Sequence, residues 1–133
     1  MQERLRHARD NWLQAYYDGD VPQLARHEHP QFQLHNRFSG QIEGSERHQH
    51  IAFAVAHQAW KPARWHIASE RFQFSDDGLT CHVEAEASAP AALIQEFWMY
   101  DGAWHIVQLV LSALDTAAIE ADEAETAVLT GRL

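Results

Sequence analysis

The sequence predicts an α+β fold in which helices pack on one face of a bent antiparallel sheet. Three observations indicate it. Helical patterns fill most of the first 60 residues, a short pair of strands interrupts them, and the rest to about residue 114 alternates as two long hairpins. A chain of 133 residues suits one domain. We expect that domain over residues 1–115, followed by an acidic tail or marginal helix over 116–133.

The first two helices are indicated by apolar spacing and by their end signals. Gly19 is expected to end a helix that starts near Glu3, and Asp20 is a good N-cap for a short second helix. The second helix must stop before Pro30, because the residue before a proline avoids helical backbone angles. The core-facing stripe of the first helix is formed by Leu5, Ala8, Trp12, Ala15 and Tyr16.

A pair of strands and a third helix come next. The segment QFQLHNRF (31–38) alternates between two faces as a strand does, and GQIEG (40–44) is a short second strand. Ser45 is expected to cap a third helix that runs to about Trp60, ahead of Pro62. All helices of the predicted domain therefore precede the two hairpins.

The first hairpin is predicted to turn at Asp77-Gly78. Cys81 falls on its apolar face, where we expect an inert core thiol rather than a nucleophile. A two-residue turn at this point pairs Gln73 with His82, Arg71 with Glu84, and Ser69 with Glu86.

The last hairpin is predicted to turn at Asp101-Gly102, and a two-residue turn places Gln95 opposite Gln108. The face with this amide pair is expected to enclose a cavity beneath the helices. The other face is also largely apolar, so we expect it to need a partner and the protein to form a homodimer through its sheet. The cavity-facing set is Leu93, Gln95, Phe97, Met99, Trp104, Ile106, Gln108 and Val110.

The overall charge excludes two classes of partner. A net charge of −9 argues against a nucleic-acid binder and against attachment to an anionic membrane. The single cysteine favours a reducing compartment, and the N-terminal MQERLRHARDNWL lacks the apolar core of a signal peptide. We therefore expect a cytoplasmic protein with neither nucleic acid nor membrane as a partner.

Ten histidines are an unusual number for this length. Histidines two apart on a helix point away from each other, so neither His27 with His29 nor His48 with His50 forms the same-face pair of a zinc helix. We expect both pairs, with Glu28 between the first two, to be solvated. The sequence predicts no metal site and no cofactor, and Asp20 is interpreted as a cap rather than as a catalytic acid.

The order of these elements resembles the NTF2-like superfamily, the cone-shaped, cystatin-like α+β fold of SnoaL-like cyclases and ketosteroid isomerases. The resemblance is carried by WLQAYYDGDVPQLARHEHPQF, by GQIEGSERHQHI and by FWMYDGAWHIV, and it covers residues 5–114. Such a fold hosts many functions and does not decide between them.

The resemblance also locates the catalytic positions of a ketosteroid isomerase. Its first helix supplies a tyrosine, its first strand an aspartate base and a later strand a second aspartate; these positions fall on Trp12, Asn36 and Gln95. None matches, because an indole only donates and an amide cannot act as a base near neutral pH. The isomerase mechanism is therefore not expected, although the cavity is.

The preferred hypothesis is an NTF2-like homodimer that binds a small hydrophobic molecule in an aromatic-lined cone. The alternative is a SnoaL-like isomerase, dehydratase or cyclase with a pocket acid or base, for which the candidates are His35, His66, His82, His105 and Glu96. A third hypothesis is a protein-interaction module that presents the sheet face. The expected pocket lining is Trp12, Tyr16, Phe32, Leu34, Asn36, Phe38, Gln95, Phe97 and Gln108.

Overall fold

The computed structural model describes residues 2–114, and the tail expected over 116–133 lies outside the described residues. The predicted α+β class is confirmed. None of the described helices is both long and apolar enough to cross a bilayer. The helices are α1 (Gln2–Asp18), α2 (Val21–His27) and α3 (Glu46–Ala56), and the strands are β1 (Glu28–Asn36), β2 (Gln41–Glu43), β3 (His66–Phe74), β4 (Thr80–Ala89), β5 (Ala91–Tyr100) and β6 (Trp104–Ser112).

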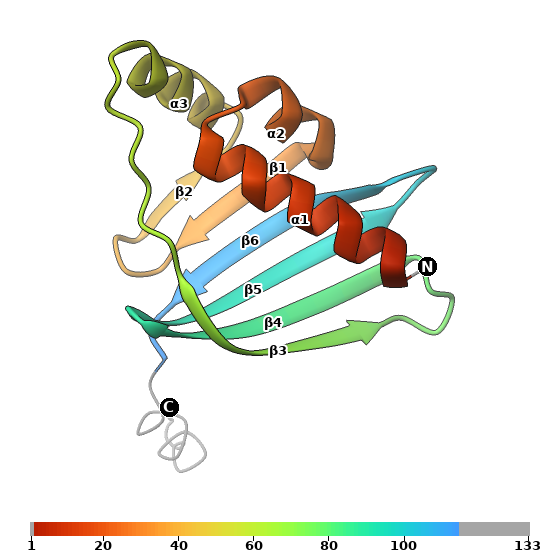
Figure 1. Cartoon of the computed structure of the whole chain (residues 1–133). Helices are drawn as coiled ribbons and strands as arrows, with labels where there is room; N and C mark the ends of the chain where they lie inside the picture. Colours follow the sequence, from red (N-terminus) through yellow and green to blue (C-terminus); the bar gives the residue numbers. More distant parts are fainter. Residues whose placement is uncertain (1, 115–133) are drawn as a thin grey trace.

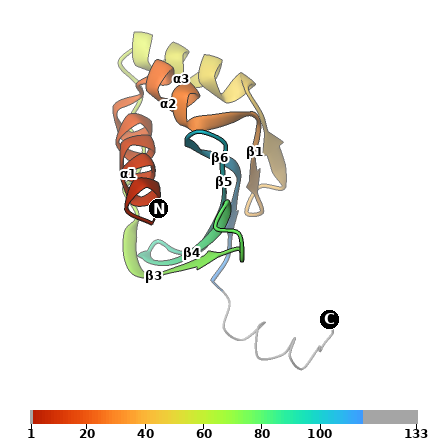
Figure 2. The same ribbon diagram turned by 90° about the vertical axis from the view of Figure 1, so that its right-hand side faces the viewer.

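The strands form one bent sheet, and α1 lies across its concave face (Figure 1). The strand order is β2-β1-β6-β5-β4-β3, with β1 parallel to β6 and the other neighbours antiparallel. A view turned by 90° shows the sheet curving around α1, with α2 and α3 at one end (Figure 2). The concave face of the sheet therefore faces α1.

The junction of α1 and α2 uses the residues that the sequence indicated. Gly19 has a φ of +71°, and the Asp20 carboxylate accepts the N–H of Gln23 at 3.3 Å, which confirms the cap. A Cβ on Gly19 would lie 2.5 Å from Val55 Cγ2 and 2.8 Å from Trp60 Cδ1. Only glycine therefore suits both the backbone angle and the close approach of the segment around α3.

The end of α3 was predicted too late, near Trp60. Gln58 has a left-handed φ of 56°, and its N–H donates to the carbonyl of Val55 at 3.0 Å. The N–H of Ala59 donates to the carbonyl of Ala54 at 2.7 Å. These two bonds form a Schellman cap, which ends the helix without the glycine that usually marks it.

The start of α3 also differs in detail from the prediction. Ser45 precedes the helix, but its side chain makes no capping hydrogen bond. The carboxylate of Glu46 instead accepts the N–H of Gly44 at 2.9 Å. The boundary was therefore correct while the predicted capping contact was wrong.

β1 begins at Glu28, earlier than the predicted Gln31. Its parallel register with β6 is irregular between Glu28 and Gln33, and Pro30 lies within this stretch, where the hydrogen-bond ladder is already interrupted. The early start brings Glu28 into the interior, where it is 6% exposed. The expectation of a solvated position for Glu28 is therefore wrong.

The register of the first hairpin was predicted correctly, although its loop is longer than expected. The N–H of Ser75 donates to the carbonyl of Thr80 at 3.0 Å, so the loop comprises residues 76–79. Because this loop, like the predicted one, has an even number of residues, the side chains of residues 69–74 and 81–86 stay on the predicted faces. The register shifts between Ser69 and the start of β3. The observed pairs include Gln73 with His82, Arg71 with Glu84, and Ser69 with Glu86.

The register of the last hairpin was predicted wrongly. Tyr100 pairs with Trp104, so the loop comprises residues 101–103, with Gly102 at a φ of +76°. An odd loop shifts the partner strand by one residue and exchanges its faces. Trp104 and Ile106 therefore point inward, each at most 3% exposed, rather than sharing a face with Met99.

A bulge at Val107 changes the register a second time. Phe97 pairs with Gln108 while Trp98 pairs with Ile106, so Val107 has no partner residue. Gln95 consequently lies opposite Val110 instead of opposite Gln108. On the inner face, β5 contributes the alternate residues Ile94, Glu96 and Trp98, and β6 contributes Leu109 and Leu111 after the bulge. Gln95 and Gln108 lie on the outer face.

Candidate ligand-binding cavity

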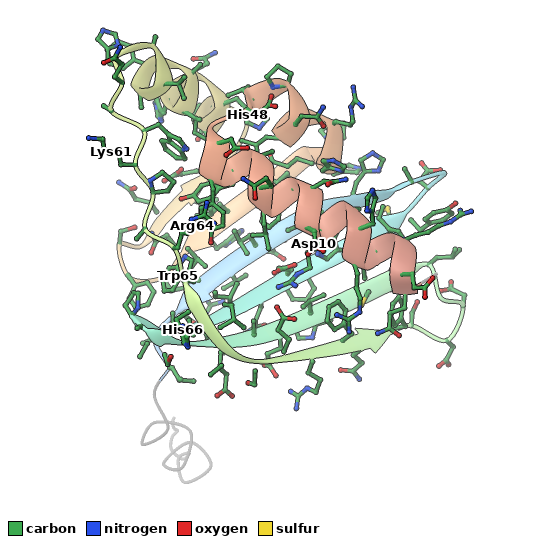
Figure 3. The ribbon with its side chains drawn as sticks, in the orientation of Figure 1. Asp10, His48, Lys61, Arg64, Trp65 and His66 are labelled. Carbon is green, nitrogen blue, oxygen red and sulfur yellow. The ribbon has the colours of Figure 1, made fainter. Side chains whose placement is uncertain are left out.

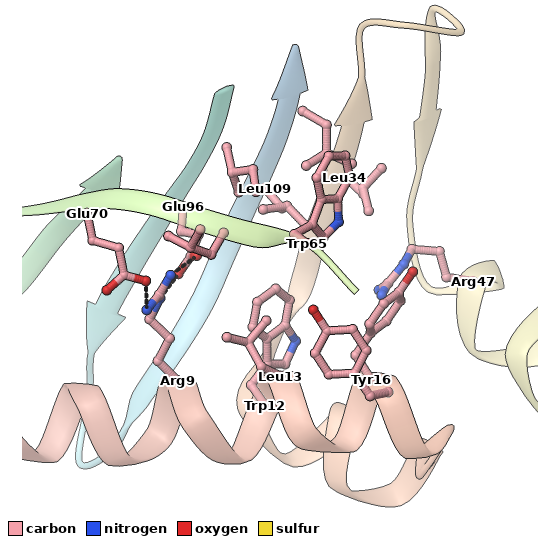
Figure 4. A pocket seen from close by; sticks show the side chains of 14 residues that line it. Arg9, Trp12, Leu13, Tyr16, Leu34, Arg47, Trp65, Glu70, Glu96 and Leu109 are labelled. Carbon is pink, nitrogen blue, oxygen red and sulfur yellow. Dashed lines mark hydrogen bonds and ion pairs between the residues drawn. The ribbon is translucent and has the colours of Figure 1, made fainter. Parts of the chain in front are cut away.

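A cavity of about 110 Å³ lies between α1 and the inner face of the sheet. Figure 4 shows side chains from α1, from several strands and from the start of α3 converging on this space. The connector from α3 to β3, which carries Arg64 and Trp65, runs in front of the sheet beside the cavity (Figure 3). Most of the wall is aromatic or aliphatic: Trp12, Leu13, Tyr16, Tyr17, Leu34, Trp65, Ile67, Ile94, Leu109 and Leu111. The remaining lining residues are Arg9, Arg47, Glu70 and Glu96.

Arg9 on α1 forms a closed ionic network at one end of the cavity (Figure 4). Its Nε and Nη2 donate to the two oxygens of Glu96 at 2.7 and 2.9 Å, and its Nη1 donates to Glu70 at 2.9 Å. Trp98 Nε1 also donates to Glu96, at 2.8 Å. All three guanidinium nitrogens of Arg9 therefore have carboxylate acceptors, and both oxygens of Glu96 are occupied.

The charges of this network stabilise each other. Burial alone would lower the pKa of Arg9, but its hydrogen bonds and ion pairs with Glu96 and Glu70 outweigh burial and raise it. Arg9 is thus a permanent cation beside Glu96 and Glu70. Both oxygens of Glu96 already accept hydrogen bonds from Arg9 and Trp98, so this geometry favours a structural role for Glu96.

Glu28 at the start of β1 forms the second buried network. Trp12 Nε1 donates to it at 2.9 Å, and Arg47 Nη1 donates to its two oxygens at 3.1 and 3.2 Å. His48 Nε2 lies 2.7 Å from the same carboxylate. The histidine, which was expected to be solvated, is therefore held against Glu28, and the network joins α1, β1 and α3.

Arg47 and Tyr16 lie at this second end of the cavity (Figure 4). Arg47 is 4% exposed, and its guanidinium carbon lies 5.0 Å from the centre of the Phe32 ring. Burial raises the pKa of Tyr16, and the nearby positive charge of Arg47 partly offsets this rise. The Tyr16 hydroxyl is therefore a neutral hydrogen-bond donor at neutral pH.

Solved structures share this architecture, while no protein-family model and no curated protein matches the sequence. An NTF2-like protein from Cytophaga hutchinsonii aligns with 86% of this chain and 98% of its own, at a TM-score of 0.64 and 16% sequence identity. A CaMKII hub from S. rosetta aligns with 84% of this chain and 95% of its own, at a TM-score of 0.60 and 14% identity. A protein with a cystatin-like fold from Nostoc punctiforme aligns with 87% and 92% of the two chains, at a TM-score of 0.61 and 11% identity.

The fold is NTF2-like. The expected resemblance is therefore confirmed for the architecture, and the NTF2-like cone is the space in which the cavity lies. The three positions aligned with isomerase residues have other roles here. The Trp12 indole donates a hydrogen bond to Glu28, and the Asn36 side chain accepts one from the Phe38 N–H in the turn after β1. Gln95 lies on the outer face of the sheet.

The NTF2-like cone brings together only part of the expected lining. Trp12, Tyr16 and Leu34 line the cavity, whereas Phe32 is buried beside it, with its ring edge-to-face on Trp12 at 6.5 Å. The other expected residues lie elsewhere for two reasons. The altered register puts Gln95, Phe97 and Gln108 outside, and the strand ends before Phe38.

Asn36 and Phe38 belong to the turn after β1. The Asn36 side-chain oxygen accepts the N–H groups of Phe38 and Ser39 at 3.0 and 3.3 Å, which is an Asx turn. Phe38 is 55% exposed. Strand alternation predicted that Asn36 and Phe38 face the cavity. The Asn36 side chain is instead hydrogen-bonded within the turn, and neither residue lines the cavity.

Of the five acid or base candidates, only Glu96 borders the cavity. His82 stacks on Phe97 with ring centres 4.6 Å apart on the outer face, and its Nε2 has no hydrogen-bond partner among the described residues. His66 is exposed at the start of β3 (Figure 3). His35 contacts Gln33 at 3.1 Å, and His105 pairs with Met99 across the last hairpin.

The charged lining residues Arg9 and Arg47 were not predicted, although one signal was present. Arg9 precedes Trp12 and Tyr16 at helical spacing, so it occupies the apolar stripe of α1. Glu96 similarly occupies the apolar face that carries Ile94 and Trp98. A charged residue at a core position requires a buried partner of opposite charge, and this requirement links Arg9 to Glu96.

Proposed function

We propose that the protein binds a small, largely apolar molecule in the cavity between α1 and the sheet. The observation that supports this function is the composition of the wall. Ten of its fourteen lining residues are aromatic or aliphatic, and the polar groups lie at the two ends of the space. An apolar space with a few polar groups is the usual form of a ligand site.

The size of the cavity restricts the ligand to about one ring. A volume of about 110 Å³ is well below the roughly 300–1,000 Å³ of pockets that hold drug-sized molecules. It is comparable with a cavity of about 150 Å³ that holds benzene in an engineered protein. A molecule as large as a steroid would require the connector beside Trp65 to move.

Acid–base catalysis is the alternative function, and the contacts of Glu96 weigh against it. Both oxygens of this carboxylate accept hydrogen bonds, from Arg9 and from Trp98. The four histidine candidates do not line the cavity. Binding without proton transfer therefore agrees better with the arrangement of these residues.

Ligand binding is testable by filling the cavity. We expect single-ring compounds such as toluene and indole to bind the unmodified protein, as measured by line broadening of their proton NMR signals. Leu111→Trp should abolish this binding because its indole occupies the cavity, whereas Leu79→Trp, in an exposed turn, should leave binding unchanged. Equal binding to both variants would contradict the proposed site, and so would a lack of binding by every ring compound.

We further propose that the protein forms a homodimer through the outer face of its sheet. This face carries the stacked pair His82 and Phe97, and a depression of about 400 Å³ lies around them. Val107, lifted by the bulge, lies beside the same depression. A second copy would cover this partly apolar surface.

The dimer is expected to be visible by analytical ultracentrifugation at micromolar concentration. Phe97→Glu should give monomers because it places a charge in the proposed interface. Phe38→Glu, which changes an exposed phenylalanine in the turn after β1, is the matched control and should remain dimeric. Sedimentation of the unmodified protein as a monomer at all concentrations would exclude the dimer.

A further inference from the structure

The two arginines of the cavity differ in how many of their donors are occupied. Arg9 donates from Nε, Nη1 and Nη2, and each bond ends on a carboxylate. Arg47 donates only from Nη1, to Glu28. Within residues 2–114, its Nε and Nη2 have no hydrogen-bond partner. These two nitrogens lie on one edge of the guanidinium group and form the fork that binds both oxygens of a carboxylate.

Arg47 is held in a fixed position before any ligand arrives. Its Nη1 is bound to Glu28, and its guanidinium group lies over the Phe32 ring. Trp12 and His48 also contact Glu28, so the position of this carboxylate does not depend on Arg47 alone. Donors fixed in advance lose little conformational freedom on binding, which favours affinity for an acceptor of matching shape.

Tyr16 supplies a further donor at the same end. It lines the cavity with Arg47, and its hydroxyl has no hydrogen-bond partner in the described part of the chain. The two enclosed side-chain polar atoms without a partner there are His82 Nε2 and Trp104 Nε1, so the free donors of Arg47 and Tyr16 are not sealed within the protein. Both residues line the cavity, so we expect a ligand there to accept from these donors.

We propose that Arg47 and Tyr16 bind the carboxylate of a small monocarboxylic acid whose apolar part fills the cavity. The inference rests on the proposed ligand-binding function and specifies the ligand class. An anion is expected at Arg47 rather than at Arg9, because the fork of Arg9 is already occupied by Glu96. A second negative group on the ligand would meet Glu70 and Glu96 at the far end, so the tail should be uncharged.

The test compares benzoate with nitrobenzene, which has nearly the same shape but no net charge. Titrations are followed by two-dimensional NMR of the ¹⁵N-labelled protein. We expect benzoate to bind at least about tenfold more tightly, because hydrogen bonds to a charged group are stronger than those to a neutral one. Shifts should concentrate around Arg47 and Tyr16.

Two variants separate the carboxylate contact from the apolar cavity. Arg47→Lys keeps a positive charge beside Glu28 but removes the fork, and Tyr16→Phe removes only the hydroxyl. Each should weaken benzoate binding, by about tenfold for the lysine variant, and leave nitrobenzene binding within about twofold. Tyr100→Phe is the matched control, because it also removes one tyrosine hydroxyl but Tyr100 does not line the cavity, and both affinities should be unchanged.

The outcomes distinguish this inference from the function on which it rests. If nitrobenzene binds as tightly as benzoate, or if the preference for benzoate survives in both variants, the carboxylate site is wrong and the apolar cavity remains. If neither compound binds and neutral rings such as toluene also fail, the proposed function is wrong and the inference falls with it. The stated preference and its loss in Arg47→Lys and Tyr16→Phe would establish the site.

Discussion

Replacing Glu96 by alanine is expected to lower the free energy of unfolding by about 3–5 kcal/mol. The substitution leaves the Arg9 side chain, which is 7% exposed, without the acceptor of its Nε and Nη2 donors. Glu70 remains, but its side chain is 30% exposed and receives only one bond. Trp98 Nε1 loses its acceptor as well. The loss is a large part of the stability of an ordinary domain, about 5–15 kcal/mol.

The measurement is urea unfolding followed by far-ultraviolet circular dichroism. The matched control is Glu84→Ala, which breaks the surface ion pair with Arg71 and should cost at most about 1 kcal/mol. Arg9→Met combined with Glu96→Leu removes both charges and should recover most of the loss, because an apolar pair of similar volume replaces a buried ion pair with little cost. Similar losses in Glu96→Ala and Glu84→Ala would contradict the structural role of the Arg9 network.

Replacing Trp98 by alanine is expected to cost about 3–5 kcal/mol, the usual range for removing a large buried aromatic side chain. Trp98 is 1% exposed, and its ring meets that of Trp12 edge to face at 5.9 Å. The substitution removes this contact, leaves a cavity and takes one hydrogen bond from Glu96. Its effect therefore combines packing with the polar network.

The same unfolding experiment measures this effect. Trp65→Ala is the control, because Trp65 is a half-buried tryptophan that lines the cavity, and we expect it to cost well under half as much. Trp98→Phe, which keeps an aromatic ring but loses the N–H donor, should fall between the two. If Trp98→Ala were no more destabilising than Trp65→Ala, Trp98 would not be a central core residue.

Most of the fold could be predicted because its signals are local. The cap at Asp20, the glycine at Gly19 and the alternation of the strands depend on short stretches of sequence. The register of the last hairpin could not be predicted in this way. Asp101-Gly102 suits both a two-residue and a three-residue loop, and only packing of Trp104 and Ile106 into the core distinguishes them. The residues around Val107 do not include a glycine or a proline that would mark a bulge in the sequence.

The site was harder to predict because it depends on partners that are distant in sequence. Arg9 and Glu96 are 87 positions apart, and Glu28 and Arg47 are 19 positions apart on different elements. Position in the isomerase fold suggested Gln95 and Asn36, whereas the structure directs these amides to the outer face and to a turn. A charged residue within an apolar stripe, such as Arg9 in α1, was the more informative signal.

The two outermost strands have a consequence for the behaviour of the protein at high concentration. β2 has three residues, and β3 has register irregularities near Ile67 and carries the charged Glu70 and Arg71. A long, flat and uncharged strand at the margin of a sheet offers free backbone groups to another molecule and promotes fibril-like association. β2 is too short to pair with a strand of another molecule in this way. β3 is made unsuitable by its irregular register and its charged residues. Where copies associate, we therefore expect contacts between side chains rather than pairing of strands.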